Sequence, residues 1–187
     1  MRIARRALSP VQRAHAERKI RGYIRGLAVF KRARRIALYL NFDGEPDLTP
    51  LANAAAEQRK ELFVPMITRS TMTFALLAPR AALARNFFGI LEPSPSRTID
   101  PRNLDLVLTP LVAFDAHGTR LGVGRGYYDR CFSFLRHRQA WQKPKLVGVG
   151  YELQFVADSL EARDWDVPLW GAVTELGVRR FARSLRE

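Results

Sequence analysis

Short runs of consecutive apolar residues alternate along the chain with longer segments whose apolar residues recur at helical spacing. Residues 36–40 (IALYL) and 145–150 (KLVGVG) are clear examples of the short runs. Such runs are typical of strands covered on both faces, which occur mainly in parallel sheets. Parallel neighbours need a crossover connection, so the alternation predicts βαβ units. We therefore predict an α/β fold with three layers, α/β/α, and a mainly parallel sheet in a single domain over residues 1–187.

Local signals predict the remaining elements. Ser9 is a typical N-cap, Pro10 presets the first turn and Gln12 can complete a capping box, so a helix is expected to begin there. Its apolar stripe, which includes Leu27, is expected to continue until the basic segment at residues 31–35 interrupts it. A second helix is expected over residues 49–59 because Thr49 and Pro50 open it. Further strands are expected at residues 61–65, 72–77, 104–110 and 172–174, and further helices at 128–135, 154–159 and 176–185.

The chain is strongly basic but has no membrane-spanning segment. Lysine and arginine number 31 against 18 acidic residues, a net charge of +13, so the surface should attract anions. No apolar run approaches the roughly 18 residues that span a bilayer, and the N-terminus lacks the apolar core of a secretory signal. Cys131 is the only cysteine, which excludes an internal disulfide and a cysteine-rich metal site. We expect a cytoplasmic protein with no membrane association.

The most specific motif lies in residues 109–129, TPLVAFDAHGTRLGVGRGYYD. Gly122, Gly124 and Gly126 stand at alternate positions directly before a predicted helix. Glycine permits positive φ and close approach of the backbone to a ligand. The start of a helix offers free N–H groups and the positive end of the helix dipole. The pattern predicts a phosphate-binding loop.

Charged residues accompany these glycines. Arg120 and Arg125 are permanent cations suited to the charge that develops when a phosphoryl group is transferred. Asp129, in the first turn of the predicted helix, either holds Mg²⁺ or favours the helix dipole, and the residues alone leave both roles open. The loop is neither a Walker A motif nor the dinucleotide fingerprint, because neither pattern occurs. Taken alone, it is also compatible with a surface turn.

The segment from Asp105 to Asp129 resembles the signature of the 5-formyltetrahydrofolate cyclo-ligase family, also called methenyltetrahydrofolate synthetases. Shorter matches follow in the same order along the chain, at residues 5–10 (RRALSP), 42–47 (FDGEPD), 88–93 (FGILEP), 147–148 with 154, and 165–169 (WDVPL) with 173–174. Only the glycine loop is specific by itself, and the order and spacing of the other matches support it.

The resemblance implies a reaction. Members of the family use ATP and Mg²⁺ to close 5-formyltetrahydrofolate to 5,10-methenyltetrahydrofolate, releasing ADP and phosphate. A formamide carbonyl is a poor electrophile, so its oxygen is phosphorylated first, and nitrogen 10 then displaces the phosphate. This chemistry needs positioning and cationic stabilisation more than a nucleophilic side chain. We expect a monomer whose partner is a small-molecule folate, with or without a polyglutamate tail, and not a nucleic acid.

The resemblance also implies site residues. The ATP-binding segment is Arg120, Leu121, Gly122, Val123, Gly124, Arg125, Gly126, Tyr127 and Tyr128, of which Val123 to Tyr127 also face the folate. Phe42, Glu45, Asp47 and Glu92 are the other candidate folate-binding residues, and Asp129 and Asp166 are the candidate Mg²⁺ ligands. The candidate catalytic residues are Arg120, Arg125 and Tyr127. An aromatic face can stack on a pterin, and a carboxylate can accept its ring N–H groups.

One part of the family pattern is missing. Relatives often carry a basic residue followed four positions later by Arg, well upstream of the first helix, and contact ATP with this pair. Here only Arg2, Arg5 and Arg6 precede Ser9, and none lies at the matching distance. Arg2 and Arg6 are the candidates to replace the pair. The alternatives are that ATP binds with fewer contacts or that the true start lies upstream.

Two other classes of function compete with the folate ligase. A sugar-phosphate isomerase or an acyl-CoA transferase of similar architecture would hold a phosphate in the glycine loop without consuming ATP. An RNA-binding protein would account for the net charge of +13 and would bind in a strongly salt-dependent way, but the chain lacks an RNP-type aromatic motif.

Overall fold

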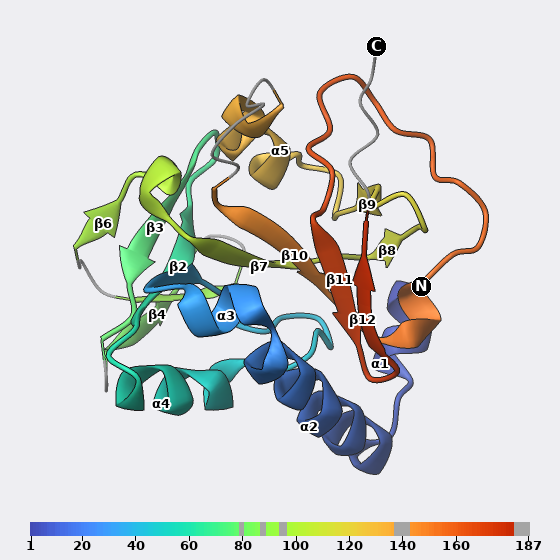
Figure 1. Cartoon of the computed structure of the whole chain (residues 1–187), viewed down its shortest axis with the longest axis horizontal. Coiled ribbons are helices and arrows are strands. Elements are labelled where there is room, and N and C mark those ends of the chain that lie inside the picture. Colours follow the sequence, from blue (N-terminus) through green and yellow to red (C-terminus); the bar gives the residue numbers. More distant parts are fainter. Residues whose placement is uncertain (79–80, 87–88, 94–96, 137–142, 182–187) are drawn as a thin grey trace.

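The computed structural model describes residues 1–78, 81–86, 89–93, 97–136 and 143–181 (Figure 1). Its helices are α1 (Arg2–Arg6), α2 (Pro10–Gly26), α3 (Ala28–Arg32), α4 (Thr49–Glu57) and α5 (Tyr127–Cys131), with 3₁₀ turns at Pro101–Asn103, Ser133–Leu135 and Glu152–Gln154. Its strands are β1 (Arg35–Ala37), β2 (Glu61–Ile67), β3 (Met72–Leu76), β4 (Leu83–Arg85), β5 (Leu91–Pro93), β6 (Thr98–Ile99), β7 (Leu106–Pro110), β8 (Ala113–Phe114), β9 (Arg120–Leu121), β10 (Lys145–Val149), β11 (Gly171–Thr174) and β12 (Gly177–Arg180). Among the described residues, no helix is long and apolar enough to span a membrane.

One large sheet organises the molecule, with strand order β12-β11-β10-β7-β1-β2-β3-β6. The central strands β11, β10, β7, β1 and β2 are parallel, whereas β12, β3 and β6 pair antiparallel towards the two edges. In the centre, Ile36 of β1 is in register with Leu62 of β2 and Leu106 of β7. The predicted α/β class and the mainly parallel sheet are confirmed.

Apolar side chains fill both faces of this sheet. On one face, Ile20 and Ile24 of α2 and Leu51 of α4 pack in one buried cluster with strand residues. On the other face, Phe74 and Phe132 are fully buried in a second cluster, beside the short helix α5. In Figure 1, α2, α3 and α4 lie together along the lower part of the view, while α5 lies at the top. The helical layer beside α5 is the thinner of the two.

The order of the strands creates a crevice between β1 and β7. The chain leaves β1 through α4 to β2 on one side, and it leaves β7 through α5 to β10 on the other. The two connections therefore diverge, so β1 and β7 flank a topological switch point. In open α/β sheets, the crevice beyond the carboxyl ends of such strands is where ligands bind.

Several predicted helix boundaries are confirmed by the local geometry. The Ser9 Oγ accepts the backbone N–H of Gln12 at 3.2 Å, and the Gln12 Oε1 accepts the N–H of Ser9 at 2.9 Å. This is the predicted capping box, and it opens α2. The predicted helix breaks after Gly26, where α2 ends, and its last part belongs to the separate short helix α3. The short helix α1, which precedes α2, was not predicted.

The helix predicted at residues 176–185 is wrong, because residues 177–180 form the edge strand β12. This strand pairs antiparallel with β11 from Thr174↔Gly177 to Gly171↔Arg180 (Figure 1). Two consecutive side chains of this strand contact different partners. Arg179 forms a 2.5 Å ion pair with Glu152, and the Arg180 guanidinium lies over the Trp170 ring. Pairing with β11 overrides the helical spacing. Residues 182–185 of the predicted helix lie outside the described residues.

Of two other predicted helices, one is shorter than expected and one is absent from the described residues. The helix predicted at residues 128–135 is α5, which ends at Cys131 and is followed by the 3₁₀ turn Ser133–Leu135. The helix predicted at 154–159 is wrong, because a single 3₁₀ turn, Glu152–Gln154, replaces it. The backbone N–H of Val156 donates to the carbonyl of Phe114 at 2.9 Å, which holds this segment against β8.

Candidate active site

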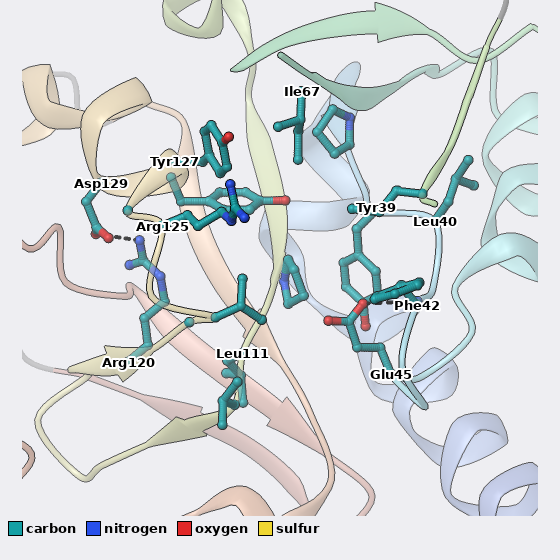
Figure 2. A pocket seen from close by; sticks show the side chains of 18 of the residues that line it. Tyr39, Leu40, Phe42, Glu45, Ile67, Leu111, Arg120, Arg125, Tyr127 and Asp129 are labelled. Atoms are coloured by element: carbon teal, nitrogen blue, oxygen red, sulfur yellow. Dashed lines mark hydrogen bonds and ion pairs between the residues drawn. The ribbon is translucent and has the colours of Figure 1, made fainter. Parts of the chain in front are cut away.

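A cavity of about 390 Å³ opens at the switch point between β1 and β7 (Figure 2). This volume lies within the range of small-molecule sites. The residues that line it are Arg2, Tyr39, Leu40, Phe42, Glu45, Pro65, Ile67, Ile90, Leu91, Pro110, Leu111, Val112, Arg120, Gly122, Val123, Arg125, Gly126, Tyr127, Tyr128 and Asp129. Figure 2 places Tyr39, Phe42 and Glu45 on one side and Arg120, Arg125 and Asp129 on the other. The cavity therefore has two walls, one from the segment after β1 and one from the glycine loop.

The first wall is residues 39–47, a tightly turned segment after β1. The Tyr39 hydroxyl donates to the carbonyl of Pro46 at 3.1 Å, and the backbone N–H of Phe42 donates to the Glu45 carboxylate at 3.2 Å. Asp43 and Gly44 both adopt positive φ, 53° and 78°. The Phe42 side chain remains 45% exposed at the cavity. The turn thus presents an aromatic face and a carboxylate to the same space.

Glu45 is the titratable group of this wall. Burial raises its pKa to about 7, although the charge of Arg5 and the hydrogen bond from the Phe42 amide favour the ionised form. Burial also raises the pKa of Tyr39 and of Tyr128, whose hydroxyls interact electrostatically with Glu45. Glu45 therefore changes its charge near neutral pH while both tyrosines remain neutral.

The second wall is the glycine loop, which contains a short hairpin of β8 and β9. The buried Asp115 holds the hairpin turn, because its Oδ1 accepts the N–H groups of His117 and Thr119, each at 2.9 Å. Gly124 and Gly126 adopt φ of 87° and 60°, values that a residue with a Cβ rarely takes. Gly126 is the N-cap of α5, which has only five residues. Because this helix is so short, the positive charge of this wall comes from Arg120 and Arg125 more than from a helix dipole.

Arg120 joins the glycine loop to the segment before β11. Its Nη2 lies 2.6 Å from the Asp129 Oδ1, and its Nη1 donates to the carbonyl of Val167. The same Asp129 oxygen accepts the N–H of Val167 at 3.1 Å. The Arg120 side chain is only 6% exposed, so the ion pair lies largely out of solvent. This arrangement fixes a cation and a carboxylate at the edge of the cavity.

The structure also brings Asp166 towards this pair. Asp166 is next to Val167 in the chain, and it lines a small surface hollow together with Arg120. Its Oδ2 accepts the N–H of Arg163 at 2.9 Å. Within the described residues, no group of three or more His, Cys, Asp or Glu is placed to hold a metal ion. The donor chemistry of Asp129 and Asp166 is compatible with Mg²⁺, which proteins typically bind through one or two carboxylates together with phosphate oxygens.

The N-terminal arginines gather on one carboxylate. Arg2 and Arg6 each donate a side-chain hydrogen bond to Asp43, with Arg2 at 2.7 Å, and Arg5 adds a third at 3.2 Å. Burial disfavours the charge of Asp43, but the hydrogen bonds from Arg6 and Arg2 outweigh it and lower the pKa to about 2. Arg2 lines the cavity, whereas Arg6 is not one of its lining residues.

Other predicted site residues lie away from the lining of the cavity. The Asp47 Oδ1 accepts the N–H of Thr49 at 2.9 Å and so caps α4. The Glu92 Oε1 accepts the N–H of Ile67 at 2.6 Å and the side-chain amide of Asn86 at 2.8 Å. Leu121 and Gly124 belong to the glycine loop, but neither residue lines the cavity.

Some lining residues were not proposed as site residues from the sequence, although several of them lie within the segments 88–93 and 109–129. They are apolar or aromatic, and most of them lie in or after the C-terminal halves of strands, whereas Ile90 and Leu91 lie at the start of β5: Tyr39, Leu40, Pro65, Ile67, Ile90, Leu91, Pro110, Leu111 and Val112. Tyr127 was predicted, and its hydroxyl donates to the carbonyl of Thr68 at 2.9 Å, which ties the glycine loop to the end of β2. For most of the others, the signal that could have found them is their position at the carboxyl ends of buried strands.

Comparisons with known proteins agree on one family. The model of the 5-formyltetrahydrofolate cyclo-ligase family matches residues 1–175. The 5-formyltetrahydrofolate cyclo-ligase of Haemophilus influenzae is 36% identical over 177 residues, covering 91% of each chain. The Escherichia coli K12 enzyme of that name is 34% identical over 181 residues, covering 93% of this chain and 96% of its own. The structure of Aquifex aeolicus 5,10-methenyltetrahydrofolate synthetase superimposes with a TM-score of 0.81 at 35% identity, covering 100% of this chain and 92% of its own.

Proposed function

The chain belongs to the 5-formyltetrahydrofolate cyclo-ligase family, and from this premise we propose that it uses ATP and Mg²⁺ to convert 5-formyltetrahydrofolate to 5,10-methenyltetrahydrofolate, with ADP and phosphate as the other products. The observation that carries the proposal is that two different walls line the same cavity. One wall bears Phe42 and Glu45, and the other is the glycine loop with its arginines. A folate and a nucleotide would meet there with their reacting groups adjacent.

The glycine-loop wall is the proposed nucleotide side. Arg120 and Arg125 line the cavity and bring two positive charges to it, and Gly122 and Gly126 let the backbone approach the phosphates. Arg2, on the opposite rim, adds a third guanidinium. When bound, Mg²⁺ would offset the charge of the phosphate oxygens, and Asp129 and Asp166 are the residues that would hold it.

The wall after β1 is the proposed folate side. The half-exposed ring of Phe42 offers a face on which a pterin can stack, and the ionised Glu45 can accept the pterin N–H groups. Asp47 caps α4, so its proposed contribution is to hold this turn in place. Glu92 would act similarly by fixing the segment that carries Ile90 and Leu91 at the cavity.

Two bond exchanges complete the proposed reaction. The formyl oxygen attacks the γ-phosphorus, the bond between that phosphorus and the β-bridging oxygen breaks, and ADP leaves. Nitrogen 10 then attacks the activated formyl carbon, loses its proton, and the carbon–oxygen bond to phosphate breaks. The residues of the cavity need only align these atoms and stabilise the transferred phosphoryl charge, which Arg120 and Arg125 are placed to do.

Purified protein mixed with 5-formyltetrahydrofolate, ATP and Mg²⁺ is expected to develop the absorbance of the methenyl product. Omission of ATP should abolish this change, because the formyl oxygen would not be activated. A sugar-phosphate isomerase or acyl-CoA transferase, which the comparisons do not favour, would give no ATP-dependent absorbance. Protein that binds both substrates but forms neither chromophore nor ADP would contradict the proposed function.

Binding of 5-formyltetrahydrofolate without nucleotide is expected to weaken up to about tenfold between pH 8 and pH 6. Burial raises the pKa of Glu45 to about 7, so the carboxylate that accepts the pterin N–H groups is mostly protonated at pH 6. The neighbouring Asp43 has a pKa of about 2, and the pKa values of Tyr39 and Tyr128 are raised, so these groups keep their charge over this range.

Isothermal titration at half-unit pH intervals would measure this dependence. Glu45→Gln should bind weakly at pH 8 and show a flat profile, because it cannot change its charge. An unaltered pH dependence in this variant would assign the titration to another group.

A further inference from the structure

Arg5 is fully buried, 1% exposed, although arginine is rarely buried without a reason. It lies on α1, in the matched segment 5–10 but outside the lining of the cavity, and the sequence analysis assigns it no role. Its guanidinium contacts Asp43, which is 38 positions away in the chain, and Leu111, which is 106 positions away. These two partners belong to the two different walls of the cavity.

The contacts of Arg5 divide between those walls. Its Nε donates to the carbonyl of Asp43 at 3.1 Å and its Nη2 to the Asp43 carboxylate at 3.2 Å, both in the turn that carries Phe42 and Glu45. Its Nη1 donates to the carbonyl of Leu111 at 3.1 Å, directly after β7 and before the glycine loop. One planar side chain thus connects the segment after β1 with the segment after β7.

Neighbouring contacts hold this bridge in one position. The Arg13 Nη1 donates to the carbonyl of Gly44 at 2.8 Å, and its Nη2 donates to the carbonyl of Arg5 at 3.3 Å. Asp43 adopts φ of 53°, an uncommon conformation that persists only where surrounding contacts enforce it. The turn of the first wall is therefore fixed with reference to α1.

We propose that Arg5 is a positioning residue that sets the separation of the folate wall from the nucleotide wall, through Asp43 on one side and the Leu111 carbonyl on the other. This inference rests on the proposed function for its catalytic consequence. Each ligand would touch mainly its own wall, so Arg5 would contribute little to the binding of either one alone. It would act on the alignment of the formyl oxygen with the γ-phosphorus, where a displacement of about 1 Å can cost 10²-fold in rate.

Arg5→Lys tests the proposal because lysine keeps the charge and the long aliphatic chain. Its ammonium group cannot reproduce the planar arrangement of N–H donors by which Arg5 hydrogen-bonds to both walls at once. We expect kcat to fall about 10- to 30-fold, while the Kd of 5-formyltetrahydrofolate alone and of a non-hydrolysable ATP analogue alone each change less than about threefold. Arg18→Met, an exposed arginine of α2 that contacts His15, is the matched control and should retain kcat. A wild-type kcat in Arg5→Lys, or a loss confined to the affinity of one ligand, would overturn the proposal.

Amide hydrogen exchange of the unliganded protein separates this proposal from the proposed function, since it needs no turnover. In Arg5→Lys, exchange should accelerate both in residues 41–47 and in residues 111–113. Gln154→Met is the contrast, because Gln154 donates to the same Leu111 carbonyl, at 2.7 Å, and its other side-chain hydrogen bonds within the described residues are to Val112 and Tyr151, not to the first wall. It should accelerate exchange only around residues 111–113.

Acceleration in a single segment of Arg5→Lys would refute the bridge even if the enzyme assay succeeds. A wild-type protein without activity, combined with acceleration in both segments, would refute the proposed function and leave the bridge supported. If Arg5→Lys does not fold, Asp43→Asn weakens the same bridge while keeping an acceptor oxygen, and the same exchange comparison applies.

Discussion

Asp129→Asn is expected to lower turnover by about 10²-fold or more at saturating 5-formyltetrahydrofolate and ATP. The amide keeps an oxygen for the N–H of Val167 and for Arg120 but removes the negative charge proposed to hold Mg²⁺. A hundredfold loss corresponds to about 2.7 kcal/mol of transition-state stabilisation, within the range measured when one electrostatic contact is deleted. Initial rates of methenyl formation over a range of Mg²⁺ concentrations would measure the effect.

Stability changes cannot account for a loss of this size. Weakening the partly buried pair of Asp129 with Arg120 should lower the free energy of unfolding by about 1–2 kcal/mol. A domain that starts at about 5–15 kcal/mol remains folded after such a change. Asp158→Asn, at an exposed position, should alter neither quantity. If the rate falls only in proportion to the folded fraction, or the Mg²⁺ requirement does not change, Asp129 has no role at the metal.

The parts of the fold that sequence reasoning predicted are those encoded by adjacent residues. Ser9 and Gln12 meet within one helical turn, and the apolar run at 36–40 overlaps the strand β1, which is Arg35–Ala37 and so ends earlier than predicted. The edge strand β12 was assigned to a helix because its partners, β11, Glu152 and Trp170, are not visible in its own residues. Edge elements depend on such tertiary contacts more than central strands do.

The same distinction applies to the candidate site: the sequence predicted the part formed by adjacent residues and missed contacts between residues distant in the chain. The glycine loop was found because its signal is continuous in the sequence, and residues 120–129 lie largely at the cavity. The contacts of Arg5 with Asp43 and Leu111 were not found, because the three residues become neighbours only when β1 and β7 pair. The apolar lining was missed for a related reason, since a strand end that faces a cavity has the same composition as one that faces the core.

Both the sequence around Arg120 and its contacts in the structure bear on its role. Its place beside the glycines suggests a phosphate contact, whereas its hydrogen bonds to Asp129 and to the Val167 carbonyl suggest support of the metal side. A bound triphosphate would compete with Asp129 for the same guanidinium. The ion pair of the unliganded protein would then be exchanged for a pair with phosphate, and the Asp129 carboxylate would become available to Mg²⁺.

Arg120→Ala is therefore expected to lower kcat/KM for ATP by about 10³-fold, the lower end of the effect of deleting an arginine that stabilises phosphoryl transfer. Arg120→Lys should recover only part of this loss, because an ammonium group supplies the charge but not the fork. Affinity for 5-formyltetrahydrofolate alone should change little, since Phe42 and Glu45 lie on the opposite wall. Steady-state kinetics with ATP varied at fixed, saturating folate would measure the effect.

Added guanidinium ion distinguishes the two roles of Arg120. In Arg120→Ala, the ion should restore part of the lost rate if the missing group acts by its charge on phosphate, and the KM for ATP should fall as the ion is added. Support of Asp129 alone would instead appear as a raised Mg²⁺ requirement with an unchanged KM for ATP. Arg25→Met, an exposed arginine of α2, controls for the loss of one positive charge from this basic protein. A wild-type dependence on ATP in Arg120→Ala would place the phosphates elsewhere in the cavity.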